Sequence, residues 1–244
     1  MNKLIIVNPP DINETRFSIR SYRFTDLHAV RVIYGDDEFA RPQLLQKYPQ
    51  MREYLADEAS HYYTCYEPES ILVAEAEGEV VGALLGAVNT TRYKHIYKHH
   101  VQPLLIRRCL SGAYGLPIWL LPVIQTELAS RNVIAPQVDL RQYPAHLHIG
   151  VWDNWRRQGI GTSLMAGYTD YLRQKDVAGY HLYASSFHPL GMAFYRKLGL
   201  DVLGEFTWRL HNGFDWMTVT EYIFGQRLNK HSGSSQSTGA GSSR

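Results

Sequence analysis

The sequence predicts an α/β protein built on one mixed central sheet of about six to seven strands, flanked by helices. Two signals indicate hairpins and therefore antiparallel strand pairs: Glu77-Gly78-Glu79 and Asn212-Gly213 each lie between two apolar runs. A strand–helix–strand order over residues 147–184 indicates a parallel pair, because the crossover helix returns the chain in the same direction. Both kinds of pair in one chain predict a sheet of mixed direction.

The first part of the chain predicts one strand, two helices and a hairpin. Apolar–polar alternation predicts a strand over residues 17–22, and Thr25-Asp26 marks the start of the next helix. Helical spacing of apolar residues predicts a single helix from Gln43 to Tyr63. Two apolar runs, residues 71–76 and 80–88, predict the strands of the first hairpin.

The second part predicts a helical insertion followed by alternating strands and helices. We expect the insertion to span residues 90–142, with helices near 92–112 and 117–131. After it the pattern predicts a strand at 147–151, a helix at 160–174, a strand at 180–184, a helix at 190–198, and strands at 202–210 and 215–224.

One domain, over residues 16–228, accounts for most of the 244 residues. Residues 1–15 form an N-terminal extension. From His231 onward the chain is almost entirely Ser and Gly, with Ala240 as its one apolar residue. Such a segment cannot bury a core, so we expect residues 229–244 to be a disordered tail.

Composition excludes several classes of protein. A formal net charge of +2 is too small to indicate nucleic acid as the main partner. Cys65 and Cys109 are the only cysteines, so a disulfide framework and a four-cysteine zinc site are excluded. The apolar run Leu4-Ile5-Ile6-Val7 is too short for a secretory signal or for a membrane span of about 20 residues. We expect a soluble cytoplasmic protein without a membrane partner, and the sequence leaves a homodimer open.

The segment from Arg156 to Thr162 follows a predicted strand and opens a predicted helix. Gly159 and Gly161 carry no side chains, so backbone N–H groups can approach a ligand closely. The first turn of the helix adds unsatisfied N–H donors and a partial positive charge. Together these features predict an anion site suited to a pyrophosphate, although glycines before a helix also occur in purely structural turns. The Gly-Lys-Ser/Thr ending of a P-loop and the three-glycine spacing of a Rossmann fold are both missing.

With these residues the sequence resembles the GNAT acetyltransferase superfamily. The family signature Arg/Gln-x-x-Gly-x-Gly/Ala is matched by Arg156, Gly159 and Gly161. A second family motif, Asn-x-x-Ala-x-x-Phe-Tyr-x-Lys-x-Gly-Phe, aligns with residues 188–200. In that stretch Phe194, Tyr195, Lys197 and Gly199 agree with the motif, whereas His188, Gly191 and Leu200 differ from it.

A third stretch, residues 143–149, is similar to a GNAT subgroup that includes the acetyltransferase-like domain of bifunctional O-GlcNAcases. That subgroup has Asp at the position where this chain has Gly150. The resemblance implies a GNAT fold over residues 16–228 and acetyl-CoA as the cofactor.

By resemblance, backbone amides of the segment after the central strand hold the pyrophosphate of coenzyme A, and the strand itself holds the pantetheine arm. The implied cofactor-binding residues are Ile149, Gly150, Val151, Arg156, Arg157, Gln158, Gly159, Ile160, Gly161, Thr162, His188, Phe194 and Lys197.

Acetyl transfer from a thioester to an amine requires a neutral amine, a stabilised oxyanion and a proton for the leaving thiolate. The resemblance implies direct attack without an acyl-enzyme, so Cys65 and Cys109 need not be nucleophiles. It also implies Tyr195 as the general acid, because a phenol with a pKa near ~10 is well matched to a thiolate. The alternative is that Phe194-Tyr195 is simply the core-facing side of a helix.

His146 and His148 are the candidate general bases. They alternate with Leu147 and Ile149 and so share one face of a strand, and imidazole titrates near neutrality. A histidine on a strand is also commonly a packed, hydrogen-bonded residue. Asp153 is a weaker candidate, and the spacing of the two histidines is not diagnostic of a metal, so we expect none.

The sequence therefore predicts an acetyl-CoA-dependent N-acetyltransferase acting on a primary amine of a small molecule or a protein. The alternative is a non-catalytic module that binds acyl-CoA. A basic segment in the insertion is either a solvated helix face or an electropositive rim for an anion. Its members are Arg92, Lys94, His95, Lys98, His99, His100, Arg107 and Arg108.

Overall fold

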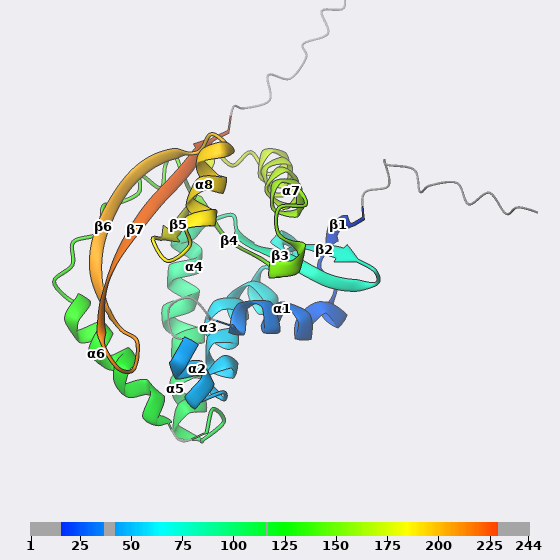
Figure 1. Ribbon diagram of the computed structural model, residues 1–244. Coiled ribbons are helices and arrows are strands. Elements are labelled where there is room, and N and C mark those ends of the chain that lie inside the picture. Colours follow the sequence, from blue (N-terminus) through cyan, green and yellow to red (C-terminus); the bar gives the residue numbers. More distant parts are fainter. Residues whose placement is uncertain (1–15, 37–41, 116, 229–244) are drawn as a thin grey trace, which may run out of the picture.

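The computed structural model describes residues 16–36, 42–115 and 117–228 (Figure 1). The extension over 1–15 and the tail over 229–244 lie outside these residues. The described chain forms a seven-stranded sheet in the order β1-β2-β3-β4-β5-β7-β6. Its neighbouring strands are antiparallel except β4 and β5, which are parallel. The predicted mixed sheet is therefore confirmed.

The strands agree closely with those predicted. They are β1 (Ser18–Ser21), β2 (Leu72–Ala76), β3 (Glu79–Ala87), β4 (Ala145–Val151), β5 (Gly179–Ser185), β6 (Asp201–His211) and β7 (Trp216–Arg227). The α-helices are α1 (Leu27–Gly35), α2 (Pro42–Lys47), α3 (Met51–Tyr66), α4 (Thr90–Ile96), α5 (Gln102–Leu110), α6 (Leu120–Ser130), α7 (Ile160–Gln174) and α8 (Pro189–Lys197).

Both predicted hairpins form, and each turn uses backbone conformations that its residues tolerate. Between β2 and β3, Glu77 and Gly78 have φ of +55° and +83°, as a tight two-residue hairpin turn requires. Between β6 and β7, Gly213 has φ +102°, and the Asn212 side chain accepts hydrogen bonds from the amides of Phe214 and Asp215. The turns therefore fix the register of both pairs.

The single helix predicted from Gln43 to Tyr63 is wrong, because the structure has two helices, α2 and α3. Pro49 lies between them and has no N–H to continue the helical hydrogen bonding. Bonding restarts beyond it, where Arg52 N donates to the Pro49 carbonyl at 3.1 Å. The insertion also differs in detail: a π-helical turn (Tyr97–Val101) joins α4 to α5.

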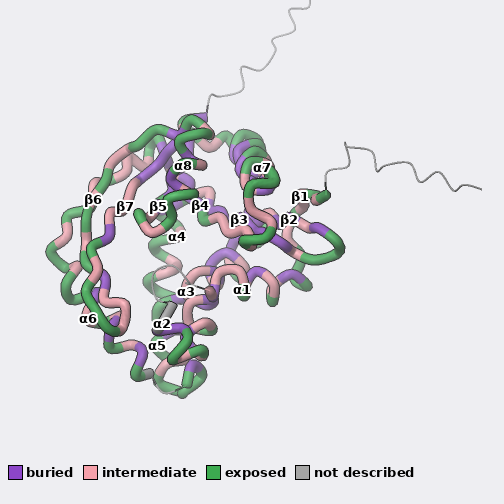
Figure 2. The backbone as a smooth tube through the Cα atoms, in the orientation of Figure 1, coloured by how far each residue is buried: buried purple, intermediate pink, exposed green. Residues whose placement is uncertain are grey.

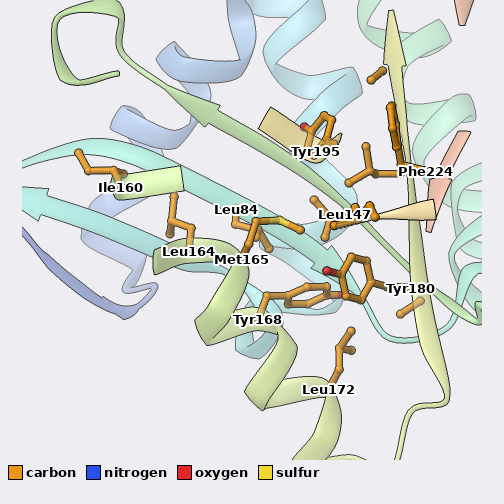
Figure 3. Close-up of a cluster of buried hydrophobic side chains, with 14 of the residues drawn as sticks. Leu84, Leu147, Ile160, Leu164, Met165, Tyr168, Leu172, Tyr180, Tyr195 and Phe224 are labelled. Carbon is orange, nitrogen blue, oxygen red and sulfur yellow. The ribbon is translucent and has the colours of Figure 1, made fainter. Parts of the chain in front are cut away.

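Helices cover both faces of the sheet (Figure 1). Successive side chains of β4 point to opposite faces, so they pack in two different clusters. Leu147 packs with Tyr168 of α7 and Phe224 of β7 in one apolar cluster, which Figure 3 shows in close-up. The opposite face carries a second cluster, with Tyr63 of α3 and Leu85 of β3. In Figure 2 the buried residues follow the strands and the sheet-facing sides of these helices.

One buried carboxylate that ties the helical insertion to the rest of the domain is that of Asp57 on α3. It accepts hydrogen bonds from Arg31 of α1, Arg108 of α5 and the Tyr114 hydroxyl, the last at 2.6 Å. Burial acts to raise the pKa of Asp57, but these three donors outweigh it and hold the pKa below its usual value. Of the basic segment, Arg108 therefore has a structural role.

Tyr168 joins α7 to the centre of the sheet. Its buried hydroxyl donates to the carbonyls of Ala87 and His146, at 3.2 and 3.1 Å. The ring lies directly over Gly86, where a Cβ atom would come within 2.1 Å of it. Within the described residues, no helix is both long and apolar enough to cross a bilayer.

Two Gly→Ala substitutions are expected to have opposite effects on stability. Gly86→Ala forces a methyl group into the Tyr168 ring and should cost about 1–3 kcal/mol of unfolding free energy. Gly191→Ala, in α8, places its methyl group 3.6 Å or more from any neighbour and should stabilise by up to about 1 kcal/mol. Urea denaturation measures both, and equal effects would contradict the packing described.

Candidate active site

The strands β4 and β5 lie side by side over only two residue pairs, Ala145↔Tyr180 and His146↔His181. β4 continues to Val151 and is paired there with β3 alone. Because a strand has two hydrogen-bonding edges, the second half of β4 presents one unpaired edge toward the space that β5 has left. This free edge is the central feature of the site.

The register decides which backbone groups of β4 face the gap. Trp152 N donates to Val81 O at 3.0 Å, and bonding alternates along an antiparallel ladder, so Gly150 and His148 bond to β3. The backbone groups of Ile149 and Val151 therefore face the gap. The Val151 carbonyl accepts from Arg156 Nε at 3.0 Å, so an extended ligand would find the Ile149 N–H and C=O and the Val151 N–H.

Gly150 has a structural reason to be glycine. A Cβ atom there would lie 2.7 Å from Ile33 Cγ2 of α1, and the backbone groups of Gly150 face β3. Sequence reasoning placed this residue among the cofactor-binding groups. Its position instead indicates that it lets α1 pack on β4.

The segment between β4 and α7 has the shape of an anion-binding loop. The backbone of Arg157 and of Gly159 has a left-handed conformation, with φ of +63° and +89°, so the chain turns sharply twice. The first bond of α7 is Ser163 N to Gly159 O at 3.0 Å, so the amides of residues 160–162 have no intrahelical partner. The first turn of α7 contains no acidic residue. Turned N–H groups and the positive helix end can together hold a phosphate.

The two predicted motifs meet at the start of α7. A Cβ atom on Gly161 would lie 3.1 Å from Phe194 Cζ, so the ring of α8 rests against this glycine. Gln158 Nε2 donates to Asn154 O at 3.0 Å, which closes the loop. Residues far apart in sequence thus form one wall of the gap.

Arg156 fastens the loop to the end of β4. Its guanidinium bonds the Val151 carbonyl and pairs with Asp153 at 2.7 Å. Asp153, the weaker candidate base, is exposed and engaged in this ion pair. These contacts make both residues part of the loop framework.

His188 and Lys197 lie at opposite ends of α8. His188 is the exposed N-cap, and its N–H donates to Ser185 O at 2.9 Å. Lys197 is exposed in the last turn, about 13 Å further along the axis at 1.5 Å per residue, where its charge favours the helix end. The helix therefore cannot present both side chains to the same part of a ligand.

Tyr195 is buried in the apolar cluster beside Phe224, with ring centroids 5.5 Å apart (Figure 3). Burial raises the pKa of its phenol well above the usual value. None of the hydrogen bonds among the described residues uses its hydroxyl. Burial, and after it the charge of Tyr195, also raises the pKa of Tyr34, whose hydroxyl donates to His148 O. The Tyr195 hydroxyl therefore lies within electrostatic reach of β4 and stays protonated at neutral pH.

The two candidate histidines differ. His146 is buried, with Nε2 3.0 Å from the Tyr63 hydroxyl and Nδ1 2.8 Å from Thr90 Oγ1. Burial holds its pKa well below the usual value. Both ring nitrogens are engaged, which argues against the predicted role as a base.

His148 lies two residues further on, where β5 has diverged, and the residue is exposed to solvent although the surrounding protein still desolvates its ring. Desolvation by the surrounding protein, followed by the charge of His181, lowers the pKa of His148 to about 4. The imidazole is therefore neutral at pH 7 and has a free capacity to accept a proton, although it is a weak base.

Sequence reasoning missed Glu221 on β7. It lies opposite Ser185 of β5 and Phe206 of β6 and is partly buried. Burial raises the pKa of Glu221 to about 7, although a hydrogen bond from Trp208 acts to lower it. The signal was present, because Glu221 occupies an inward position between Val219 and Ile223 in a strand of period two.

A cavity of about 280 Å³ lies between α6 and β6 and shares no residue with the loop before α7. It is lined by Val123, Thr126, Glu127, Ser130, Val133, Ala135, Phe206 and Trp208. In the described parts of the chain, no group of three or more His, Cys, Asp or Glu side chains is arranged to hold a metal ion.

The fold resembles those of several solved proteins. No model of a known family matches the sequence. The structure is similar to SsHAT, with 22% identity, 88% of this chain and 99% of that chain covered, and a TM-score of 0.61. It is also similar to an N-acetyltransferase from Staphylococcus aureus Mu50, with 16% identity, 87% and 99% covered, and a TM-score of 0.52.

A third similar structure is that of yncA, a putative acetyltransferase from Salmonella typhimurium with its cofactor acetyl-CoA. Its identity is 13%, 89% of this chain and 96% of that chain are covered, and the TM-score is 0.51. At these identities the likeness establishes the fold. The chain has the fold of the GNAT acetyltransferases, as the sequence motifs predict.

The environment of Glu221 predicts a pH-dependent effect on stability. Its pKa rises from 4.5 to about 7 on folding, so its favourable contribution is full below pH 4.5 and is lost as the pH rises through 7. The glutamine in Glu221→Gln cannot ionise, so the contribution of this residue to the unfolding free energy does not fall as the pH rises. Relative to wild type, this variant should gain on the order of 2 kcal/mol of unfolding free energy between pH 5 and pH 8.

Urea denaturation at the two pH values measures this difference. Glu205→Gln is the matched control, because Glu205 is exposed on the same hairpin. A difference for Glu221→Gln that does not change with pH would contradict the raised pKa.

Proposed function

We propose that this protein is an acetyl-CoA-dependent N-acetyltransferase that moves an acetyl group, by direct attack, to a primary amine of a small molecule or a protein. The observation that carries this proposal is the free edge of β4, which leads directly into the loop before α7. An extended arm can bond along such an edge, while a pyrophosphate binds at the helix start. The cofactor of the similar Salmonella protein, acetyl-CoA, has both parts.

The proposed cofactor contacts follow the gap from strand to helix. The Ile149 N–H and C=O and the Val151 N–H would bond the pantetheine amides. The amides of residues 160–162 would bond the pyrophosphate, with Arg157 shaping the turn. Phe194, resting on Gly161, would border the arm where it passes from the strand to the helix.

The proposed chemistry divides its proton transfers between the two sides of the sheet. As the amine nitrogen forms its bond to the acetyl carbon, a β4 N–H would stabilise the oxyanion. Tyr195 would give its proton to the departing thiolate, and His148 would receive the amine proton directly or through water. Each atom is then accounted for without a covalent enzyme intermediate.

The alternative is a non-catalytic acyl-CoA-binding module. Two observations favour it: His146 is fully hydrogen-bonded, and His148, with its pKa lowered to about 4, is a weak base. Calorimetry with acetyl-CoA, followed by thiol release over a panel of amines and peptides, separates the two. Binding with turnover supports the enzyme, binding without turnover supports the module, and no binding refutes both.

The phosphate loop is tested by a pair of substitutions at Thr162, which is exposed in the first turn of α7. Thr162→Glu should weaken acetyl-CoA binding roughly tenfold or more, because its negative charge repels the phosphates at the same helix end. Thr162→Gln has the same shape without the charge and should bind as wild type. Glutamate in a first turn stabilises a helix, so thermal unfolding should show no loss. Equal affinity in the two variants would show that the pyrophosphate binds elsewhere.

The role of Tyr195 is tested by Tyr195→Phe. Loss of the general acid should lower kcat about 100-fold or more, while the Kd for acetyl-CoA changes little. Tyr180→Phe is the control: it removes a hydroxyl from the same cluster, but one that is engaged with the Gln226 side chain at 2.6 Å. An unchanged kcat in Tyr195→Phe would leave Tyr195 as a packing residue.

A further inference from the structure

Glu221 and His148 point to the same side of the sheet. His146 pairs with His181, so two residues further along their strands His148 and Tyr183 keep that face. Ser185 follows on β5 and lies opposite Glu221 of β7. Residues directly opposite one another share a face, so Glu221 and His148 lie on the same face of the sheet, on strands to either side of β5.

The Glu221 carboxyl lacks a compensating cation. Among the described residues, no Lys, Arg or His forms an ion pair with it, and its partner is the Trp208 side chain. The neighbouring Tyr183 is a phenol and carries no positive charge; burial, and after it the charge of Glu221, raises the pKa of Tyr183. A partly buried, unpaired carboxylate is costly, and a cationic ligand would remove that cost.

The cavity between α6 and β6 adjoins this carboxyl. Phe206 is the cross-strand neighbour of Glu221, Trp208 donates to it, and both residues also form a wall of the cavity. Its volume of about 280 Å³ exceeds the roughly 150 Å³ that holds a benzene molecule in an engineered apolar cavity.

The residues that line the cavity disfavour a negatively charged ligand. Its lining is mainly apolar and aromatic, and its one charged member is Glu127, an acid. The buried Ser130 hydroxyl there has no hydrogen-bond partner. An apolar group fits this lining, whereas a phosphate or carboxylate would meet no cation and two acids.

We propose that Glu221 and the α6–β6 cavity form a binding site for a primary ammonium compound that carries an apolar or aromatic group. The ammonium contacts Glu221 beside the β4–β5 gap, and the apolar group enters the cavity between Phe206 and α6. Insofar as this compound is the acceptor of acetyl transfer, the inference rests on the function proposed above. Glu221 then selects the acceptor class, and the cavity selects for its apolar part.

The test is calorimetry with 2-phenylethylamine as the probe, compared with its neutral analogue 2-phenylethanol and with methylamine. Wild type should bind 2-phenylethylamine at least tenfold more tightly than either of the other two. Glu221→Gln should weaken that binding at least tenfold and leave 2-phenylethanol unaffected. Glu205→Gln, an exposed acid on the same hairpin, should bind as wild type.

A second variant tests the cavity without touching the charge. Ala135→Leu narrows the cavity. It should weaken the binding of 2-phenylethylamine and leave the binding of methylamine unchanged. In a thiol-release assay, Glu221→Gln should raise KM for 2-phenylethylamine far more than it lowers kcat. Wild type that fails to bind 2-phenylethylamine, or binding unaffected by Glu221→Gln, would overturn the proposal.

Acetyl-CoA binding, measured on the same samples, separates this inference from the proposed function. Acetyl-CoA binding without amine binding refutes the amine site alone. Amine binding that depends on Glu221, without acetyl-CoA binding, refutes the acetyltransferase and retains the amine site.

Discussion

The early separation of β5 from β4 is the constraint on which the site depends, because it leaves a polar strand edge unpaired inside the molecule. Such an edge would be unstable if the strand were held on one side by hydrogen bonds alone. Two tyrosines from opposite faces strengthen the paired side. Tyr34 bonds the carbonyls of Ala83 and His148, and Tyr168 bonds those of Ala87 and His146. The β3–β4 ladder is therefore rigid enough to present its other edge, and the loop of Arg156 continues that edge to the positive end of α7.

Among the described residues, the partly or fully buried acids Asp57, Glu67 and Glu221 differ in how their charge is compensated. The Asp57 carboxylate accepts from two arginines and a tyrosine, so its charge is compensated and holds the insertion in place. Glu67 likewise accepts from Tyr62 and from the amide of Val88. Within the described parts of the chain, the donor to Glu221 is the Trp208 indole, and the pKa of Glu221 is raised to about 7. The proposed ammonium ligand would supply the compensating charge that the described residues do not give Glu221.

Much of the fold could be predicted from sequence because its signals are local. Turn residues mark both hairpins, and the glycines after β4 mark the start of α7, so these elements have the predicted limits within a few residues. The break at Pro49 was missed because the apolar spacing continues across it. The roles of individual site residues could not be predicted, because distant partners decide them. His146 bonds Tyr63 and Thr90, 83 and 56 residues away, and Gly150 is required by Ile33.

The same separation explains why two histidines on one strand face have different chemistry. His146 lies where β4 and β5 are still paired, so the closed sheet and α3 bury it and occupy both ring nitrogens. His148 lies one step beyond the last pair, where solvent reaches the ring. The alternation of side chains along β4 places both histidines on the same face. The separation of β5 from β4 gives them different surroundings. Under the proposed function, the amine proton would pass to a group beyond the last β4–β5 pair, on the face where Glu221 also lies. Because His148 is a weak base, the proposed reaction would depend most on binding of the amine beside the Glu221 carboxylate.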